Sequence, residues 1–440
     1  MLRSTVILWS LVSIFVAFVF WISSVLPSLV SESDRSLIVR LCLNLLGYAT
    51  ILVPGYLLLQ YVKRRNGLSD QSGRYSSLIR SCFVGGGGGG GNECDKSRNN
   101  SENEIAERST IQRARILSLC ALGLGASYLV WGFLQEKIMT TDYVTNDGAT
   151  TRYSDSQFLV FVNRILALAL SGCGVLLTAQ HVRHNHTMPL YKYSYCSLSN
   201  VMSSWCQYEA LKYVSFPIQV LTKACKVIPV MAMGKIVSKK TYEYYEYGTA
   251  LFISVGMTMF LFGSTEERQH ATETTFAGLV ILFGYIVFDS FTSNWQHALF
   301  ARYEMSWVQM MCGVNLFSCL FTSVSLLQQG GFVSSFRFMH DCPRFVVDIF
   351  VLSICSAVGQ MFVFYTISQF GAVVFAYIMT FRQCLAVLLS CLVYKHPVDT
   401  FGVFGITFVF IAVFLRTFCN QRASKAKKSL VLDAAVVSRV

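Results

Sequence analysis

The chain has 440 residues and a formal net charge of +12, yet 53% of its residues are hydrophobic and only 14% are charged. This composition excludes a soluble globular protein of such length, because the surface of one needs far more charge. The apolar residues form long blocks, several reaching the roughly 20 residues that cross a bilayer. We therefore predict an all-α, multi-pass membrane protein whose basic residues mark loops on the cytoplasmic side rather than a nucleic-acid surface.

Twelve apolar segments are candidates for membrane spans. In chain order they are 5–26, 36–61, 113–134, 158–180, 192–212, 217–237, 247–263, 275–298, 306–327, 346–368, 372–393 and 399–418. The first could be a secretory signal peptide, but its apolar run is long and a second block follows soon after, which favours a retained helix.

A change of composition separates the second span from the third. Residues 62–112 contain seven consecutive glycines, Gly85–Gly91, among Ser, Asn and charged residues, which is typical of a flexible linker. A phosphate-binding loop is excluded because no strand precedes the glycines and no GK[ST] follows them. We predict a two-helix extension (1–61), this linker, and a ten-helix core consisting of a first half (113–263), a lumenal linker (264–274) and a second half (275–418), with a basic tail (419–440).

The distribution of charge predicts the orientation of the core. Ten basic residues lie between Lys63 and Arg115, and four more lie in the tail between Arg422 and Lys428. Both segments are expected on the cytoplasmic side, and the ten intervening spans allow this. The loops 135–157 and 264–274 are more acidic and fall on the other side.

Ten spans also permit two related halves of five, as in transporters built from inverted repeats. The fourth helix of the first half contains Thr222-Lys223-Ala224-Cys225, and that of the second half contains Phe381-Arg382-Gln383-Cys384. The basic residue and the cysteine keep the same register at an offset of 159. Two matched positions are slight evidence of a repeat, but one of them is a cation within an apolar helix.

Cations inside predicted spans are the strongest functional signal. A Lys or Arg near the bilayer centre costs at least about 2.5–3.5 kcal/mol, so it is retained for a purpose. Arg382 lies in the middle of its span, while Lys223 and Lys226 share one face of a helix that Pro229 is expected to kink. Three cations around one cavity would bind a phosphate or sulfate group. The alternatives are snorkelling, or pairing with the intramembrane carboxylates Glu209 and Asp289.

Neutral polar and aromatic residues inside the spans are further candidates for substrate binding. Such groups can stack on a base or bond to its edges, although hydrogen bonds between helices explain them equally well. The candidates are Gln207, Tyr208, Asn294, Asn315, Gln360, Tyr365 and Gln383. The chain lacks a nucleophile–base arrangement and a metal-ligand motif, so we expect no catalytic residue, no metal and no cofactor.

Six long stretches make the sequence recognisable. They are 197–217, 226–247, 284–296, 308–322, 353–383 and 388–396, and they cover most of the predicted core. In these stretches the chain resembles the nucleotide-sugar transporter family of the drug/metabolite transporter superfamily. It is most similar to the branch that carries 3′-phosphoadenosine 5′-phosphosulfate (PAPS) across the Golgi membrane.

The resemblance implies a fold, a cargo and a set of contacts. The fold is a ten-helix inverted repeat in which basic residues of the fourth and ninth core helices contact substrate phosphates; here these are Lys223, Lys226 and Arg382. The implied activity is that of an antiporter, which brings PAPS from the cytosol into the Golgi lumen for sulfation and returns a spent nucleotide such as 3′-phosphoadenosine 5′-phosphate. The linker and the C-terminus would be cytoplasmic.

Two other functions stay open at this point. The same fold can carry a nucleotide sugar or ATP, and a receptor or scaffold would bind partners through its loops and tail without moving a solute. The expected partners are the small-molecule substrate and the lipid bilayer, with no nucleic acid, and the sequence leaves open whether copies associate as a homo-oligomer.

Overall fold

The computed structural model describes residues 37–65, 110–179, 188–264 and 276–394 except for short interruptions, together with scattered positions elsewhere, mainly at 402–419. The predicted span 5–26, most of the linker 62–112, the loop 264–274 and the tail 419–440 lie almost entirely outside the described residues.

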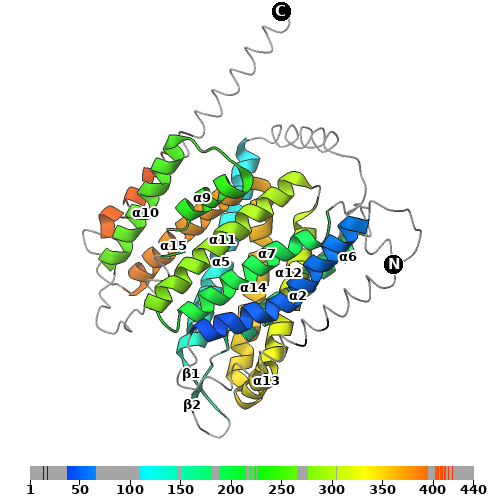
Figure 1. Ribbon diagram of the computed structural model, residues 1–440. Helices are drawn as coiled ribbons and strands as arrows, with labels where there is room; N and C mark the ends of the chain where they lie inside the picture. Colours follow the sequence, from blue (N-terminus) through cyan, green and yellow to red (C-terminus); the bar gives the residue numbers. More distant parts are fainter. Residues whose placement is uncertain are drawn as a thin grey trace, which may run out of the picture.

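The described part is a bundle of helices with one short β-hairpin (Figure 1). The helices are α2 (Leu37–Arg65), α5 (Thr110–Thr140), α6 (Ser156–Ala179), α7 (Tyr191–Ala210), α9 (Val227–Ser238), α10 (Tyr244–Ser264), α11 (Phe276–Arg302), α12 (Trp307–Gln329), α13 (Gly331–Asp341), α14 (Pro343–Phe370) and α15 (Ala372–Tyr394). Strands β1 (Asp142–Val144) and β2 (Thr150–Arg152) pair antiparallel, with Tyr143 opposite Thr151.

Six of the described helices are long and apolar enough to cross a membrane. The prediction of an all-α, multi-pass membrane protein is therefore confirmed at this level. The ten-helix core with two additional N-terminal helices stays a prediction.

Local signals in the sequence explain where the best-defined helix begins and ends. Ser306 accepts a hydrogen bond from the backbone N–H of Gln309, whose side chain in turn accepts one from the N–H of Ser306, so a capping box starts α12. Gly330 ends α12 in the left-handed region, with φ of 68°, which residues with a Cβ adopt at a cost. The chain thus turns sharply into α13.

The expected single span over 217–237 is interrupted, and this corrects the prediction. Residues 222 and 223 are helical, a turn follows at 225–226, and α9 begins at Val227 with Lys226 as its N-cap. Pro229 is the third residue of α9, where its missing N–H has no helical acceptor to lose. The break therefore places Lys226 at the start of a new helix.

The hairpin and α13 lie together at one end of the bundle, which we call the strand end (Figure 1, bottom). There the rings of Tyr143, Tyr153, Phe338 and Phe345 pack with centroid separations of 4.5–6.2 Å. We call these four residues the strand-end seal. They join the hairpin, which precedes α6, to helices α13 and α14 of the second predicted half.

Polar contacts complete this end. The Tyr143 hydroxyl donates to Asp348, whose carboxylate also forms an ion pair with Lys137 at 2.8 Å. Burial, together with this carboxylate, raises the pKa of Tyr143. The Tyr153 hydroxyl lies 3.0 Å from the Ser335 hydroxyl. Every polar group named here therefore has a partner.

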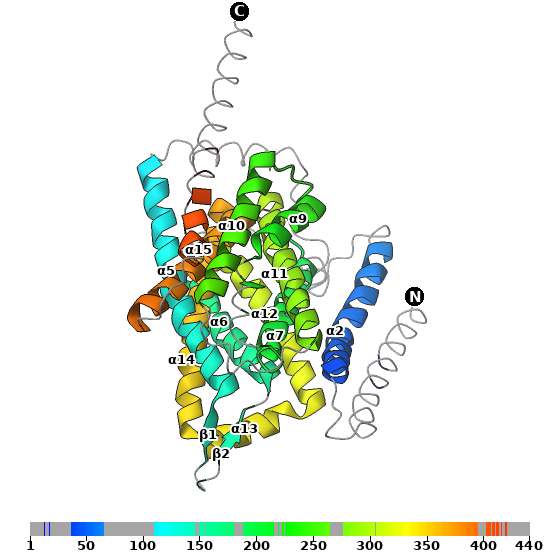
Figure 2. The ribbon, with the colours of Figure 1, turned by 90° about the vertical axis from the view of Figure 1, so that its left-hand side faces the viewer.

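Helices from the two predicted halves pack against each other throughout the bundle. The main contacts join α7 to α11, α6 to α12, and α5 to α14, while α9 packs on both α11 and α15. The view in Figure 2 shows α5 and α14 side by side. The centre of the molecule is therefore an interface between the halves.

Helix α2 lies along the side of this bundle and packs on α12 (Figure 2). The buried Asn44 side chain accepts hydrogen bonds from Ser325 at 3.0 Å and from Gln329 at 2.8 Å. Tyr48 accepts a hydrogen bond from Gln157 of α6 at 2.6 Å. One helix of the extension is thereby attached to both halves of the core.

Candidate functional site

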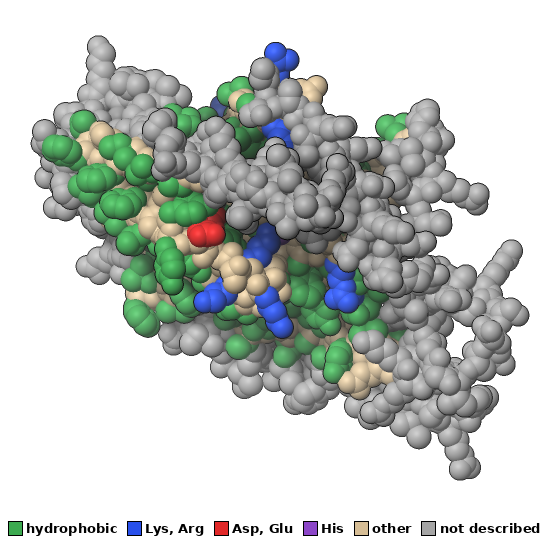
Figure 3. Space-filling view, turned by 90° about the horizontal axis from the view of Figure 1, so that it is seen from above, with side chains coloured by type: hydrophobic (Ala, Val, Ile, Leu, Met, Phe, Trp, Pro, Cys, Tyr) green, Lys and Arg blue, Asp and Glu red, His purple; other side chains and the backbone are tan. Residues whose placement is uncertain are grey.

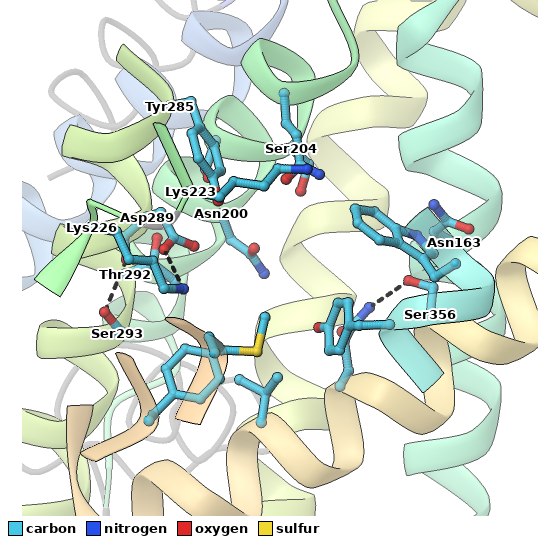
Figure 4. A pocket seen from close by; sticks show the side chains of 18 of the residues that line it. Asn163, Asn200, Ser204, Lys223, Lys226, Tyr285, Asp289, Thr292, Ser293 and Ser356 are labelled. Atoms are coloured by element: carbon cyan, nitrogen blue, oxygen red, sulfur yellow. Dashed lines mark hydrogen bonds and ion pairs between the residues drawn. The ribbon is translucent and has the colours of Figure 1, made fainter. Parts of the chain in front are cut away.

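A cavity lies at the interface between the halves, surrounded by α5, α6, α7, α11, α14 and α15 and by the chain around the break before α9 (Figure 4). Its lining contains four basic side chains and one acidic side chain among the described residues. They are Arg164, Lys223, Lys226, Arg382 and Asp289. The charge of the lining is therefore strongly positive, in a part of the molecule where uncompensated charge is costly.

Lys226 forms the one ion pair found among these five residues. Its Nζ lies 3.3 Å from the Asp289 carboxylate and 4.7 Å from the centre of the Phe375 ring. Figure 4 shows both side chains on the same wall of the cavity, with the ion pair dashed. Lys226 is buried. The sequence left open whether an intramembrane carboxylate pairs with this lysine. In this structure Asp289 does so.

Lys223 has a neutral partner. Its Nζ donates to Gln219 at 3.0 Å and lies 5.8 Å from the centre of the Trp131 ring. Gln219 in turn donates to the backbone carbonyl of Gln207 at 2.7 Å. This bond holds the Gln219 side chain with its oxygen toward Lys223. Lys223, Lys226 and Arg382 all line this cavity, so the three predicted cations form one positive cluster whose members repel one another.

Arg382 also lacks an acidic partner among the described residues. Its Nη2 donates to Gln383 at 2.8 Å, the guanidinium lies 5.8 Å from the centre of the Tyr128 ring, and the buried Nε has no hydrogen-bond partner. The two cations that match at an offset of 159 residues, Lys223 and Arg382, therefore line the same cavity.

Arg164 was not among the residues predicted from the sequence. It lies on α6, only 7% exposed, and its Nη2 donates to Asn200 at 3.1 Å and to Ser204 at 2.5 Å. Its Nε has no partner. The signal that identifies Arg382, a cation inside an apolar span, is equally present for Arg164 in 158–180.

Three of the neutral candidates also line the cavity, namely Gln207, Tyr208 and Gln360. Gln207 donates to Gln135 at 3.0 Å, and Tyr208 accepts from Asn163 at 2.8 Å. Gln360 keeps a buried carbonyl oxygen without a partner. That oxygen can accept a hydrogen bond from a ligand such as a base amine.

Four other candidates do not appear in the lining. Gln383 bonds to Arg382, and Asn294 donates to backbone carbonyls of Val230 and Ser290. Asn315 donates to the carbonyl of Met311 within α12, and Tyr365 packs edge-on against Trp307. The structure gives all four a packing or bridging contact, and their role in substrate binding stays a prediction.

Glu209 is not a partner of the cavity cations. Its carboxylate forms an ion pair with Lys212 at 2.7 Å and accepts a hydrogen bond from Ser156 at 2.8 Å. Within the described residues, no group of three or more His, Cys, Asp or Glu side chains could hold a metal ion. The chemistry that this lining supplies is the binding of a polyanion by charge and hydrogen bonds.

A multi-pass helical bundle with a polar, cationic cavity between two sets of helices defines a membrane transport protein. Residues 116–420 match the UAA transporter family, and the chain belongs to this family. The family and the similar proteins are transporters, so the protein is not an enzyme.

Similar proteins from animals match almost the whole chain. Adenosine 3′-phospho 5′-phosphosulfate transporter 1 of Homo sapiens is 50% identical over 402 residues, which cover 91% of each chain. The protein of the same name from Drosophila melanogaster is 48% identical and covers 90% of this chain and 86% of its own. UDP-galactose/UDP-glucose transporter 5B of Arabidopsis thaliana is 36% identical and covers 68% and 87%. These matches confirm the resemblance found in the sequence.

Proposed function

We propose that the protein transports PAPS from the cytosol into the Golgi lumen, where it serves as sulfate donor. The observation that carries this proposal is the charge of the cavity, where four cations face one carboxylate. PAPS bears a 3′-phosphate and a 5′-phosphosulfate and so offers several negative charges. The two animal relatives named above carry PAPS in their names.

The predicted residues have distinct parts in the proposed binding step. Arg382 and Lys223, which have neutral partners, are ready to receive an anionic group. Lys226 must leave Asp289 to contact the substrate, so its ion pair opens when the substrate enters and forms again when it leaves. In this way the cavity is never without a counter-charge for Lys226.

Helix packing supports the proposed inverted repeat, with halves that rock about the cavity. If α5, α6, α7 and α9 correspond to α11, α12, α14 and α15, each contact between halves among these eight helices has a counterpart or maps onto itself. The pair α5–α14 corresponds to α11–α7, α6–α14 to α12–α7, and α15–α5 to α9–α11. A pseudo-two-fold axis would produce this pattern, and it would place Lys223 and Arg382 in equivalent positions.

Charge supports the proposed orientation. The end opposite the strands carries Lys192, Lys235, Lys239, Lys240 and Arg302, and Figure 3 shows basic side chains gathered near the middle of that face. The strand end also carries basic residues, but Arg113 and Arg115 at the start of α5 add to the basic excess of the opposite end, whereas Asp142, Asp155, Asp341 and Asp348 offset the charge of Lys137, Arg152, Lys212, Arg337 and Arg344 at the strand end. We therefore assign the opposite end, with the linker and the C-terminus, to the cytosol and the strand end to the lumen.

Exchange follows from the same charges. An empty cavity with unpaired cations is costly to carry through a closed state, whereas a returning anion such as 3′-phosphoadenosine 5′-phosphate neutralises it. The proposed protein is thus an antiporter in which either nucleotide satisfies the cationic lining.

The test is uptake of PAPS, labelled with radioactive sulfur, into liposomes that contain the purified protein. Saturable uptake that rises when the vesicles are preloaded with 3′-phosphoadenosine 5′-phosphate would establish cargo and exchange. Entry of UDP-galactose or ATP in place of PAPS would move the cargo to the alternative that the Arabidopsis relative represents. Absence of nucleotide flux in folded protein would favour a receptor or scaffold.

A further inference from the structure

We propose that Arg164 forms a second anion subsite and binds the 3′-phosphate of the substrate, apart from the cluster of Lys223, Lys226 and Arg382. The proposal rests on the proposed function. Through Arg164 the protein would favour nucleotides with anionic groups at both the 3′ and the 5′ position over nucleotides with a single phosphate chain.

The surroundings of Arg164 separate it from the cluster. In the cluster, Lys226 pairs with Asp289 and Lys223 donates to Gln219. The Arg382 guanidinium lies 5.8 Å from the centre of the Tyr128 ring and donates to Gln383. The side-chain partners of Arg164 are instead two neutral residues of α7, Asn200 and Ser204. In Figure 4, Asn163, the neighbour of Arg164 in the chain, lies across the cavity from Lys226.

The environment of Arg164 is prepared for an anion. Asn200 and Ser204, both on α7, hold one nitrogen of the guanidinium, while the buried Nε has no partner. Buried N–H groups in native proteins are almost always paired, so this one calls for an acceptor. None of the ion pairs in the described part of the chain involves Arg164.

A phosphate satisfies both requirements. It accepts two hydrogen bonds from the guanidinium fork and compensates a charge that the apolar helix α6 otherwise carries alone. The neutral partners on α7 orient the fork without neutralising it. The position therefore suits an anionic group of the ligand, since no acidic residue in the described part of the chain forms an ion pair with Arg164.

Two subsites give selectivity that one cannot. A substrate with its phosphosulfate in the cluster and a 3′-phosphate at Arg164 satisfies both regions. A nucleotide sugar or adenosine 5′-phosphosulfate would fill the cluster and leave Arg164 buried and unpaired. Sites with polar groups that lack their partner reject the incomplete ligand strongly.

The experiment compares two ligands that differ only in the 3′-phosphate. Unlabelled PAPS and adenosine 5′-phosphosulfate compete with labelled PAPS for uptake into vesicles containing wild type or Arg164→Gln. In wild type we expect PAPS to compete about 10- to 100-fold better, as for a charge-assisted hydrogen bond. In Arg164→Gln this ratio should fall to within about threefold of unity, because only PAPS loses a contact.

A matched variant separates a subsite from general weakening. Lys223→Gln should weaken both ligands equally and keep the ratio. If Arg164→Gln also lowers the affinity for both ligands equally, Arg164 has a structural role and the proposal is overturned. Should that variant not fold, as judged by its melting temperature in detergent, Arg164→Lys and Asn200→Ala must reduce the ratio, and an unchanged ratio in both overturns the subsite. Wild type without PAPS uptake would instead overturn the proposed function.

Discussion

The cavity and the strand-end seal both lie between the two predicted halves, but they treat polar groups differently. In the seal, aromatic rings pack edge to face, and the hydroxyls of Tyr143 and Tyr153 have partners on the other half. In the cavity, Nε of Arg164 and of Arg382 and the oxygen of Gln360 are buried without partners. The first region completes its own bonds, whereas the second leaves bonds for a ligand to complete.

The largest effect is expected from Arg382→Ala. Loss of the guanidinium removes a cation of the main cluster, so PAPS uptake at low concentration should fall about 100-fold or more. The protein should still insert and keep its melting temperature, because no ion pair is broken. Uptake assays and melting curves in detergent test this.

Arg344→Ala is the matched control, since Arg344 is exposed at the strand end. It should leave uptake unchanged. Wild-type uptake in Arg382→Ala would contradict an anion site at this position. If the variant instead failed to fold, Arg382 would have a structural role like that of the residues in the strand-end seal.

Phe345→Ala should have the opposite profile. Phe345 is fully buried and contacts the other three residues of the seal. Truncation of such a ring costs about 3–5 kcal/mol of stability, so the melting temperature should fall clearly. The relative competition by PAPS and adenosine 5′-phosphosulfate should not change. A shift in that ligand ratio would show that the seal and the cavity are not separate regions.

Asp289→Asn should raise the affinity for PAPS but lower the maximal transport rate. The variant frees Lys226 for the substrate and adds one positive charge to the cavity, so KM for PAPS should fall about fivefold. The maximal rate should fall too, because no carboxylate recaptures Lys226 when substrate leaves. A higher KM would mean that Asp289 contacts the ligand or supports the fold.

The smallest effect concerns pH and Asp155 at the strand end. Asp155 accepts hydrogen bonds from the N–H groups of Gln157 and Phe158, yet burial raises its pKa above the ordinary 3.8. A carboxyl whose pKa is raised in the folded state favours folding when protonated, so its contribution declines as the pH rises from about 4 toward that raised pKa.

Asp155→Asn keeps the capping oxygen and removes this titration. We therefore expect the melting temperature of wild type, relative to that of the variant, to decline as the pH rises above about 4. Melting curves at a series of pH values give the answer. A constant difference would show that Asp155 is not under strain from burial.

Much of the fold follows from residue order alone. The apolar blocks predict the helices to within a few residues, as for 158–180 and α6, because a bilayer span imposes a minimum length. The sequence did not predict helix α13 or the hairpin, because each is short and is stabilised by packing at the strand end. The break before α9 was only partly predicted: Pro229 indicated a kink, but not that Lys226 would become an N-cap.

For the cavity, the principle of costly intramembrane charge identified three of four cations. Arg164, a cation within the apolar span 158–180, satisfies the same principle. Neutral residues were harder to assign, because a buried amide such as Asn315 can serve packing or binding with the same sequence pattern. Only the packing of helices distinguishes Gln360, which faces the cavity, from Asn315, which bonds within its own helix.

Helix α2 sets a limit on how this chain can be shortened or paired. The region that matches the family begins at residue 116, so a chain trimmed to it would lose Asn44 and Tyr48. Ser325, Gln329 and Gln157 would then lose their hydrogen-bond partners on α2, and Ser325 and Gln329 would keep only the bond between them. The same helix covers the flank of α12, so a second copy of the protein would have to associate through another face.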